Sequence, residues 1–232
     1  MKAMILAAGL GTRMRPLTDH TPKPMLRVGG KPLIEHHVRR LVGAGFCDIV
    51  INHAYLGEQI ENYLGDGRQF GAHIEYSREG EPLDSGGGIF RALPLLGNAP
   101  FVALNADVWT DYPLQQLLSL RAAIDGNKRL AHLVLTDNPP QHPRGDFYLA
   151  SDGAVHAESE NKKLTWTGIR VIHPALLANC SDGVFSIVPL LKDAMSRGLV
   201  SGEYYSGQWL DVGTPERLQE ANRIVEEKES FK

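Results

Sequence analysis

The feature that most constrains the fold is the alternation of strand-like runs with helical patterns in the first hundred residues. Each strand-like run is four or five residues long and ends at polar or glycine-rich sequence. The runs are 4–7, 48–52, 73–77 and 101–105, and the helical patterns are 32–44, 57–64 and 86–96, the last with Ser85 as its cap. Strands and helices that alternate in this way form βα units, which imply a mainly parallel sheet covered by helices on both faces.

The second half of the sequence is richer in strand patterns. Strands are expected at 130–136, 145–149 and 165–172, and helices at 186–197 and 215–229. Thr214 before Pro215 favours a helix that starts at this proline. We therefore expect an α/β fold over a single domain, residues 1–232, with a small antiparallel extension in its second half.

The charge balance and hydropathy of the chain exclude some classes of partner. It has 24 Lys and Arg residues, 27 Asp and Glu residues and a formal net charge of -3, whereas broad nucleic-acid-binding surfaces are basic. The apolar run at the first residues breaks at Gly9, and no stretch reaches the ~20 apolar residues that span a bilayer. We expect a cytoplasmic protein that binds neither nucleic acid nor membrane.

The two cysteines do not indicate a metal site. Cys47 and Cys180 lie far apart in sequence and have no CxxC spacing, so zinc is not expected. Two isolated cysteines fit a reducing compartment better than an oxidising one. Cys47 opens an apolar run and is expected in the core.

The loop after the first strand combines glycines with arginines in the string Leu6-Ala7-Ala8-Gly9-Leu10-Gly11-Thr12-Arg13-Met14-Arg15-Pro16. Small residues at a strand end let backbone N–H groups approach a phosphate closely, and Arg13 and Arg15 could neutralise phosphate oxygens. The loop is not a Walker A loop, because no G-K-[ST] follows it. It is not a dinucleotide-binding fingerprint either, because arginines stand where the helix of that motif should start. Lys23 stands between Pro22 and Pro24, in a stiff extended segment. On spacing alone, the loop could also be a simple tight turn.

The two strings L-A-A-G-x-G-T-R-x-x-P and P-K-P-x-L together resemble the amino-terminal signature of the sugar-1-phosphate nucleotidyltransferases. The resemblance covers nearly the whole chain and implies a Rossmann-like, GT-A-like fold. About 1–110 would form the nucleotide-binding half and about 111–232 the half that binds the sugar phosphate. The resemblance also implies nucleotide contacts from residues at seven positions: Ala7, Ala8, Gly9, Gly11, Thr12, Arg13 and Lys23.

A run of three glycines enters the third helical pattern. In isolation Leu83-Asp84-Ser85-Gly86-Gly87-Gly88-Ile89 reads as a flexible turn with a helix cap. In the family that this chain resembles, a matching glycine pair lies over the base and ribose, where backbone without side chains permits close packing. The resemblance therefore implies a nucleotide contact from Gly86 and Gly87, with Glu81 near the base edge.

Two aspartates are candidate ligands for a divalent cation. Asp107 ends the strand-like run at 101–105, and Asp211 lies in Trp209-Leu210-Asp211-Val212-Gly213-Thr214-Pro215, which is similar to the family's W-x-D-x-G-T-P segment. Each aspartate could instead be a turn former. Mg²⁺ takes one or two carboxylates together with substrate phosphates. The resemblance thus implies Mg²⁺ held by Asp107 and Asp211.

Contacts to the sugar phosphate are expected from the second half, together with one strand-end residue. The resemblance points to five positions: Asn105, Gly145, Glu158, Lys162 and Thr167. The family's E-x-K-P-like segment is matched here without its proline, and Lys162 is favoured over Lys163. The same residues would also make a solvated charge run, which is the alternative for 158–163.

In the family's reaction a sugar phosphate attacks the α-phosphorus of a nucleoside triphosphate. Catalysis should therefore depend more on cations that stabilise phosphate charge than on groups that transfer protons. Arg13, Lys23 and Asp107 are the expected catalytic residues. The segments 52–56, 83–89 and 105–107 resemble those of bacterial members that act on UTP and N-acetylmuramate 1-phosphate in peptidoglycan recycling. The alternatives are a mannose-1-phosphate guanylyltransferase, a phosphocholine cytidylyltransferase and a nucleotide-sensing module without catalysis. A monomer or small homo-oligomer is expected.

Overall fold

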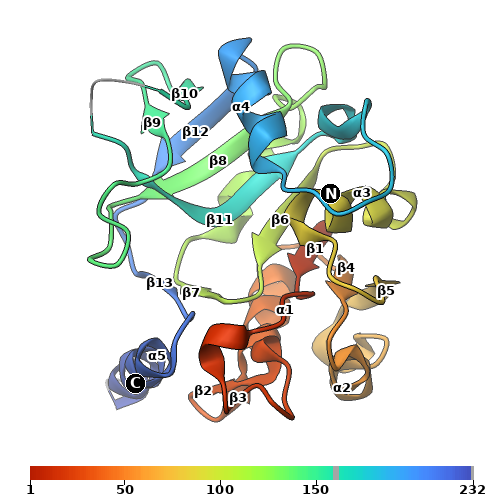
Figure 1. The fold of residues 1–232 in the computed structure, drawn as a ribbon, viewed down its shortest axis with the longest axis vertical. Helices are drawn as coiled ribbons and strands as arrows, with labels where there is room; N and C mark the ends of the chain where they lie inside the picture. Colours follow the sequence, from red (N-terminus) through yellow and green to blue (C-terminus); the bar gives the residue numbers. More distant parts are fainter. Residues whose placement is uncertain (159–161, 231–232) are drawn as a thin grey trace.

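The computed structural model describes residues 1–158 and 162–230. Seven strands form one sheet in the order β12-β8-β11-β6-β1-β4-β5 (Figure 1). They are β1 (Ala3–Leu6), β4 (Asp48–His53), β5 (His73–Arg78), β6 (Phe101–Asn105), β8 (Ala131–Thr136), β11 (Thr165–Ile172) and β12 (Val200–Tyr204). The α-helices are α1 (Leu33–Gly43), α2 (Gly57–Leu64), α3 (Asp84–Leu96), α4 (Val188–Ser196) and α5 (Pro215–Ser230).

Short elements complete the chain. Three pairs of strands lie outside the main sheet: β2 (Arg27–Val28) with β3 (Lys31–Pro32), β7 (Val108–Thr110) with β13 (Trp209–Asp211), and β9 (Tyr148–Leu149) with β10 (Val155–His156). The 3-10 helices are η1 (Thr12–Met14), η2 (Lys23–Met25), η3 (Arg68–Phe70), η4 (Leu114–Arg121) and η5 (Pro174–Leu177). The β9–β10 pair is antiparallel, as the expected small extension requires.

The main sheet is mixed but mostly parallel. Strand β11 runs antiparallel to its neighbours β6 and β8, and the other adjacent pairs run parallel. Strand β1 therefore lies between β4 and β6, and all three carboxyl ends meet at one edge. The expected mostly parallel α/β sheet is confirmed.

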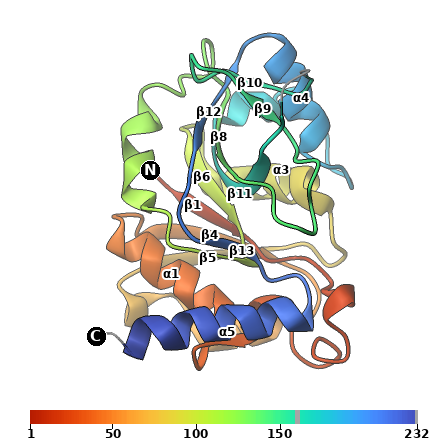
Figure 2. The ribbon, with the colours of Figure 1, turned by 90° about the vertical axis from the view of Figure 1, so that its left-hand side faces the viewer.

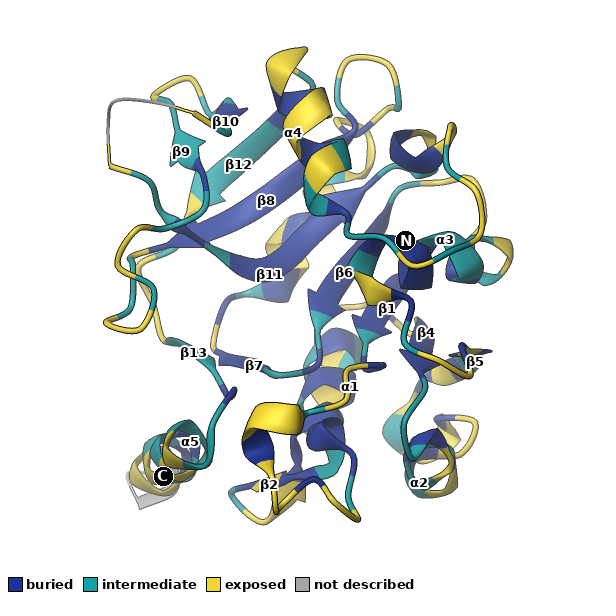
Figure 3. Cartoon of the chain, in the orientation of Figure 1, coloured by how far each residue is buried: buried dark blue, intermediate teal, exposed yellow. Residues whose placement is uncertain are grey.

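Helices cover both faces of the sheet, because alternate residues of each strand point to opposite sides. Ile5 of β1 packs in one core cluster with residues of α1 and α2, whereas Met4 packs in another with residues of α3 and α4. Figure 2 shows α1 on one side of the sheet and α3 and α4 on the other. The five inner strands of the main sheet are buried along most of their length (Figure 3), which explains their apolar sequences, whereas the edge strands β5 and β12 are only partly buried.

Helix α5 packs on the amino-terminal hairpin rather than on the main sheet. Val225 and Ala221 share a small core cluster with Val28. The Asn222 side chain accepts a hydrogen bond from Gly29 N at 2.9 Å and donates one to Arg27 O at 3.2 Å. Helix α5 is thus joined to the β2–β3 hairpin by apolar and polar contacts.

Three local expectations were wrong. Cys47 is exposed rather than in the core. The strand expected at 145–149 is reduced to β9, because Gly145 has φ +64° and departs from extended backbone. Helix α3 starts at Asp84, so Ser85 lies inside the helix instead of capping it, and its Oγ accepts a hydrogen bond from Ile187 N at 3.2 Å. No helix in the described part of the chain is long and apolar enough to cross a membrane.

Candidate active site

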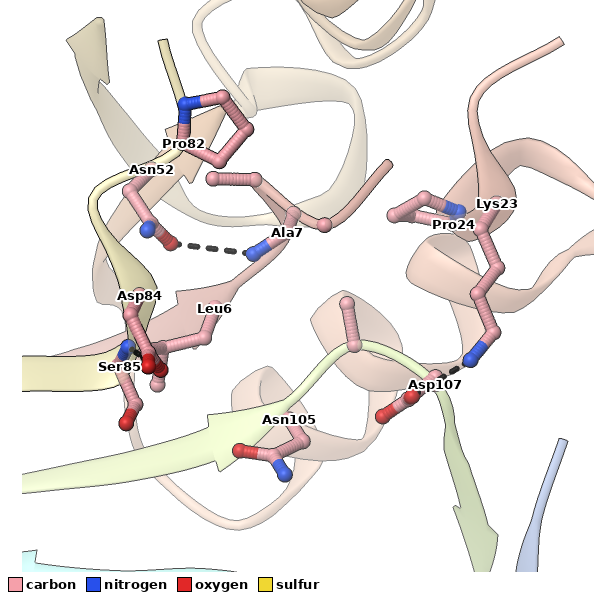
Figure 4. Close-up of a pocket in the computed structure, with 13 residues that line it drawn as sticks. Leu6, Ala7, Lys23, Pro24, Asn52, Pro82, Asp84, Ser85, Asn105 and Asp107 are labelled. Atoms are coloured by element: carbon pink, nitrogen blue, oxygen red, sulfur yellow. Dashed lines mark hydrogen bonds and ion pairs between the residues drawn. The ribbon is translucent and has the colours of Figure 1, made fainter. Parts of the chain in front are cut away.

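The carboxyl ends of β1, β4 and β6 border a cavity of about 330 Å³ (Figure 4). Leu6 at the end of β1 lies opposite Asn52 of β4 and Asn105 of β6 in the strand register. The chain leaves β1 and continues to β4 on one side, whereas β6 lies on the other side. Such a switch in strand order opens a crevice in which α/β proteins bind ligands.

Buried polar groups hold the loop that follows β1. Ala7 N donates to Asn52 Oδ1 at 3.0 Å, and Asn52 Nδ2 donates to Glu79 Oε1 at 2.5 Å. The Glu79 carboxylate also accepts a hydrogen bond from Leu83 N at 2.9 Å. Ala7, Ala8 and Gly9 line the cavity. The Asn52–Glu79 pair therefore connects the first loop to the segment before α3.

Gly11 allows the turn that brings the loop back toward Lys23. Its φ is +64°, and an added Cβ would lie 3.0 Å from Thr18 Cγ2 and 3.1 Å from Lys23 Cβ. The buried Thr18 hydroxyl donates to Gly11 O at 2.8 Å. A second cavity of about 310 Å³ lies over this loop and is lined by Gly9–Met14 together with Lys23, Asp107 and Gly213.

The structure brings Lys23 and Asp107 together across 84 residues of sequence. Lys23 Nζ lies 2.5 Å from Asp107 Oδ2, and the two side chains are 10% and 33% exposed. Figure 4 shows the two side chains pointing toward one another. Pro22 precedes η2 and Pro24 is its second residue, so Lys23 begins a 3-10 helix rather than lying in the expected extended segment. The ion pair places one cation and one carboxylate side by side at the edge of the first cavity.

The turn after β6 is supported from α1. The ring nitrogen Nε2 of His37 lies 3.2 Å from Ala106 O, and His37 is buried. Burial, assisted by the positive charge of Arg40, lowers the pKa of His37 to about 3. His37 is therefore neutral at pH 7, so its Nε2 carries the proton that this hydrogen bond requires.

A third cavity, of about 280 Å³, opens on the other side of Asn105 and Asp107. Trp166 and Trp209 supply aromatic walls, and Trp209 Nε1 donates to Thr167 O at 2.9 Å. The remaining lining is mainly polar: Arg13, Gln141, His142, Asp146, Thr165, Thr167, Gly168 and Asp211, with Val108 and Pro139. Asp107 is shared by all three cavities, and Asn105 by the first and third.

Asp211 reaches this site through the pairing of β13 with β7. Asp211 lies opposite Val108 in that ladder, and Val212 N donates to Asp107 O at 2.8 Å. Arg217 Nη1 lies 2.5 Å from Asp211 Oδ2. Gly213 leaves room for this pair, since an added Cβ would lie 2.6 Å from Arg217 Nη2.

The two aspartates suit a divalent cation. Asp107 lies in the turn directly before β7 and Asp211 lies in β13, which pairs with β7, and both aspartates line the same cavity. Hard carboxylate oxygens are the ligands that Mg²⁺ prefers. One oxygen of each carboxylate contacts a cationic side chain, Lys23 or Arg217. Residues 1–158 and 162–230 contain no group of three or more His, Cys, Asp and Glu side chains placed to hold a metal. The residues therefore fit a site completed by substrate oxygens.

The three glycines of α3 are buried against other parts of the chain. Gly86 N and Gly87 N both donate to Phe185 O, and a Cβ on Gly87 would lie 2.1 Å from Gly183 O. A Cβ on Gly88 would lie 2.5 Å from Glu79 Oε1. From this part of the chain, Pro82, Asp84 and Ser85 line the first cavity, while Glu81 is exposed beside it. Packing, rather than contact with the cavity, accounts for Gly86 and Gly87 here.

Only some of the expected sugar-phosphate residues border the third cavity. Asn105 and Thr167 line it, whereas Gly145 packs against Asn138 and Lys163 O. Glu158 is exposed and pairs at 3.4 Å with Lys163. The side chain of Lys162 is exposed, and 159–161 lie outside the described residues. The structure thus brings neither Glu158 nor Lys162 to the cavity lining.

Several lining residues were not anticipated as site residues. Asn52, Ser85 and Asp146 border the cavities, as do both tryptophans. Asn52 carried a usable signal, because a polar residue directly at the carboxyl end of an apolar strand lies at the ligand-binding edge of a parallel sheet. Asp146 carried none, since its position depends on hydrogen bonds to His142 at 3.0 Å and Trp166 N at 2.8 Å.

Comparisons with known proteins identify the family of this chain. A family model described as "Nucleotidyl transferase" matches residues 2–161. The N-acetylmuramate alpha-1-phosphate uridylyltransferase of Neisseria meningitidis serogroup B is 48% identical over 97% of this chain and 98% of its own length. The enzyme of the same name from Caulobacter vibrioides is 36% identical, covering 97% of each chain.

A solved structure shows the same fold. It is a putative glucose-1-phosphate thymidylyltransferase from Bacillus anthracis, with a TM-score of 0.83 and 23% identity, and the match covers 97% of this chain and 95% of that one. The sequence signature, the strand-edge cavities and these comparisons lead to one conclusion. The chain belongs to the nucleotidyl transferase family.

Proposed function

We propose that this protein transfers UMP from UTP to N-acetylmuramate α-1-phosphate and releases pyrophosphate. The observation that carries the proposal is the Lys23–Asp107 pair at the point where the three cavities meet. The substrates are those in the names of two relatives that align over nearly the whole chain. The proposed reaction needs two substrate sites that share one wall, and Asn105 and Asp107 supply such a wall.

Each half of the chain has a part in this proposal. Residues about 1–110 would bind the nucleotide, with Ala7, Ala8 and Gly9 beside its phosphates and Asp84 and Ser85 at the far end of the first cavity. Residues about 111–232 would bind the sugar phosphate in the third cavity. There Trp166 and Trp209 offer apolar faces to the sugar ring and the polar lining offers partners to its hydroxyl groups.

The proposed chemistry is in-line displacement at the α-phosphorus. The sugar phosphate oxygen forms the new P–O bond while the bond to the β-phosphate oxygen breaks and pyrophosphate leaves with the electron pair. Arg13 and Lys23 lower the repulsion between the two anions and stabilise charge on the phosphoryl oxygens. A phosphate monoester is already anionic near neutral pH, so a general base is unnecessary.

The proposal includes Mg²⁺ as cofactor, held by Asp107 and Asp211. When bound, it would neutralise phosphate charge at the reacting centre. Asp107 also holds Lys23 in place, and Arg217 does the same for Asp211. A cytoplasmic location and a role in peptidoglycan recycling belong to the same proposal, because they follow from the substrates.

The test is pyrophosphate release with Mg²⁺, for four nucleoside triphosphates crossed with a panel of sugar 1-phosphates that includes N-acetylmuramate and mannose. Release confined to UTP with N-acetylmuramate 1-phosphate is the expected result. Strong release with GTP and mannose 1-phosphate would keep the reaction and replace the substrates. The absence of release from folded protein that binds nucleotide would refute catalysis. In that case Asp107→Asn should leave nucleotide binding intact.

A further inference from the structure

A fully buried guanidinium lies behind the two substrate cavities. Arg170 has 0% exposure and follows the point where the register between β11 and β8 shifts. Its Nη1 donates to Asn105 Oδ1 at 2.9 Å and to Gly168 O at 2.8 Å. Within the described residues, Arg170 Nε and Nη2 have no hydrogen-bond partner. A buried charge with two unpaired donor atoms destabilises a fold, so this residue calls for an explanation other than stability.

Arg170 contacts residues that line both substrate cavities. Asn105 borders the first and third cavities, and Trp166 borders the third. The Arg170 guanidinium carbon lies 4.8 Å from the centroid of the Trp166 ring, which is the geometry of a cation–π contact. Burial lowers the pKa of Arg170 to about 9, so the group is still protonated at neutral pH. One charged side chain therefore supports two parts of the cavity lining.

The contact with Arg170 determines which way the Asn105 amide faces. A guanidinium only donates hydrogen bonds, so the Asn105 atom at 2.9 Å must be the acceptor, Oδ1. This leaves Nδ2, a donor, as the part of the amide that Asn105 can offer to a ligand. Gly168 makes space for it: an added Cβ there would lie 2.8 Å from Asn105 Nδ2. The β11 bulge, Asn105 and Arg170 form one connected unit.

We propose that Arg170 is a positioning residue that holds the Asn105 amide with its Nδ2 donor toward the substrates, at the wall shared by the nucleotide and sugar-phosphate cavities. The inference rests on the proposed function. Both substrates are anionic, so a fixed donor at this wall suits their phosphate oxygens. The buried charge of Arg170 acts in the same direction, because a cation in a low-dielectric interior attracts nearby anions strongly.

The first variant is Arg170→Met, which removes the charge and retains a side chain of similar length. The change leaves no opposite charge unpaired, because the partners of Arg170 Nη1 are the neutral acceptors Asn105 Oδ1 and Gly168 O. These acceptors lose their donor, so we expect a folded variant with a lower melting temperature than the wild type. We expect kcat/KM for N-acetylmuramate 1-phosphate to fall by more than ten-fold. Because Asn105 borders both substrate cavities, KM for UTP should rise as well. Arg197→Met, an exposed change on the surface, is the matched control.

Asn105→Asp separates positioning from structural support. The aspartate retains the shape of asparagine and gives Arg170 an anionic partner, so thermal stability should be equal to or higher than that of the wild type. The donor becomes a carboxylate oxygen that repels phosphate, and kcat/KM should fall more than ten-fold. The inference is overturned if either variant folds and its kcat/KM falls less than ten-fold. If the Arg170→Met variant does not fold, the Asn105→Asp variant alone decides. Wild-type pyrophosphate release, measured alongside, reports separately on the proposed function.

Discussion

Removal of the positive charge at Lys23 tests the proposed chemistry most directly, and the change is Lys23→Met. The ion pair with Asp107 is only partly exposed, 10% on the lysine side and 33% on the aspartate side. Its loss lies between that of an exposed pair, about 0–1 kcal/mol, and that of a buried pair, about 3–5 kcal/mol. We expect a free energy of unfolding lower by about 1–2 kcal/mol, in a protein that still folds.

The effect on catalysis should be larger than the effect on stability. A charge about 4 Å from a phosphate oxygen, in surroundings of effective dielectric constant about 20, contributes about 4 kcal/mol. Part of this energy stabilises the bound substrates as well as the transition state, and that part does not increase kcat. We therefore expect kcat to fall about 10²–10³-fold, which is the cost of removing one preorganised hydrogen-bond donor. Kinetics with both substrates saturating would give kcat, and urea unfolding would give the stability.

The matched control is Lys192→Met, because Lys192 is an exposed lysine on α4. Its kcat should equal that of the wild type. The reasoning would be refuted by a folded Lys23→Met protein with kcat within ten-fold of the wild type, since the charge would then not act at the reacting centre. A large loss in the Lys192 variant would instead show that methionine substitution disturbs the protein nonspecifically.

Three further predictions follow from the geometry. Asp211→Asn should raise the Mg²⁺ concentration that gives half-maximal pyrophosphate release about ten-fold or more. The control is Asp193→Asn, a change at an exposed aspartate. An unchanged Mg²⁺ dependence in the Asp211 variant would show that Asp211 does not bind the metal. The pKa of His37 is about 3 in the folded protein and 6.5 in the unfolded chain. Below pH 6.5 the unfolded chain therefore binds a proton that the folded protein does not, so the free energy of unfolding decreases as the pH falls from 6.5 toward 3. The free energy of unfolding, measured in urea, should decrease by about 2 kcal/mol between pH 6.5 and 5 because of this residue. The His37→Gln variant should not show this decrease. Gly88→Ala places a Cβ 2.5 Å from Glu79 Oε1 and 2.7 Å from Asn52 Nδ2, and we expect about 1–3 kcal/mol of destabilisation and a higher KM for UTP. Gly43→Ala, which meets no atom within 4 Å, should be neutral or stabilising in the same assay.

The fold was largely predictable because local pattern and tertiary structure agree. β6 and β11 are bounded as expected, and α2 begins and ends at the expected residues, since apolar runs and helical periodicity depend on burial alone. The exposed Cys47 shows the limit of this approach. A single apolar residue next to a strand carries no information about whether it lies inside the core or at its edge.

The candidate site was predictable only where strand ends reveal it. Lys23 and Asp107 could each be singled out, but their 2.5 Å contact depends on long-range packing that spacing does not encode. The packing role of Gly86 and Gly87 depends on residues about a hundred positions away. Arg170 gave no signal at all, because an arginine in a strand pattern is ordinarily expected at the surface.

The pairing of β13 with β7 also has a consequence for the order in which a ribosome produces the parts of the site. The first cavity is built entirely from residues 6–107. Asp211 is translated 104 residues after Asp107 and is held through α5, which docks on the hairpin near the start of the chain. Under the proposed roles, the residues that line the nucleotide pocket are translated early, whereas the support for α3 from Phe185 and Ile187 and the second carboxylate come only later in translation.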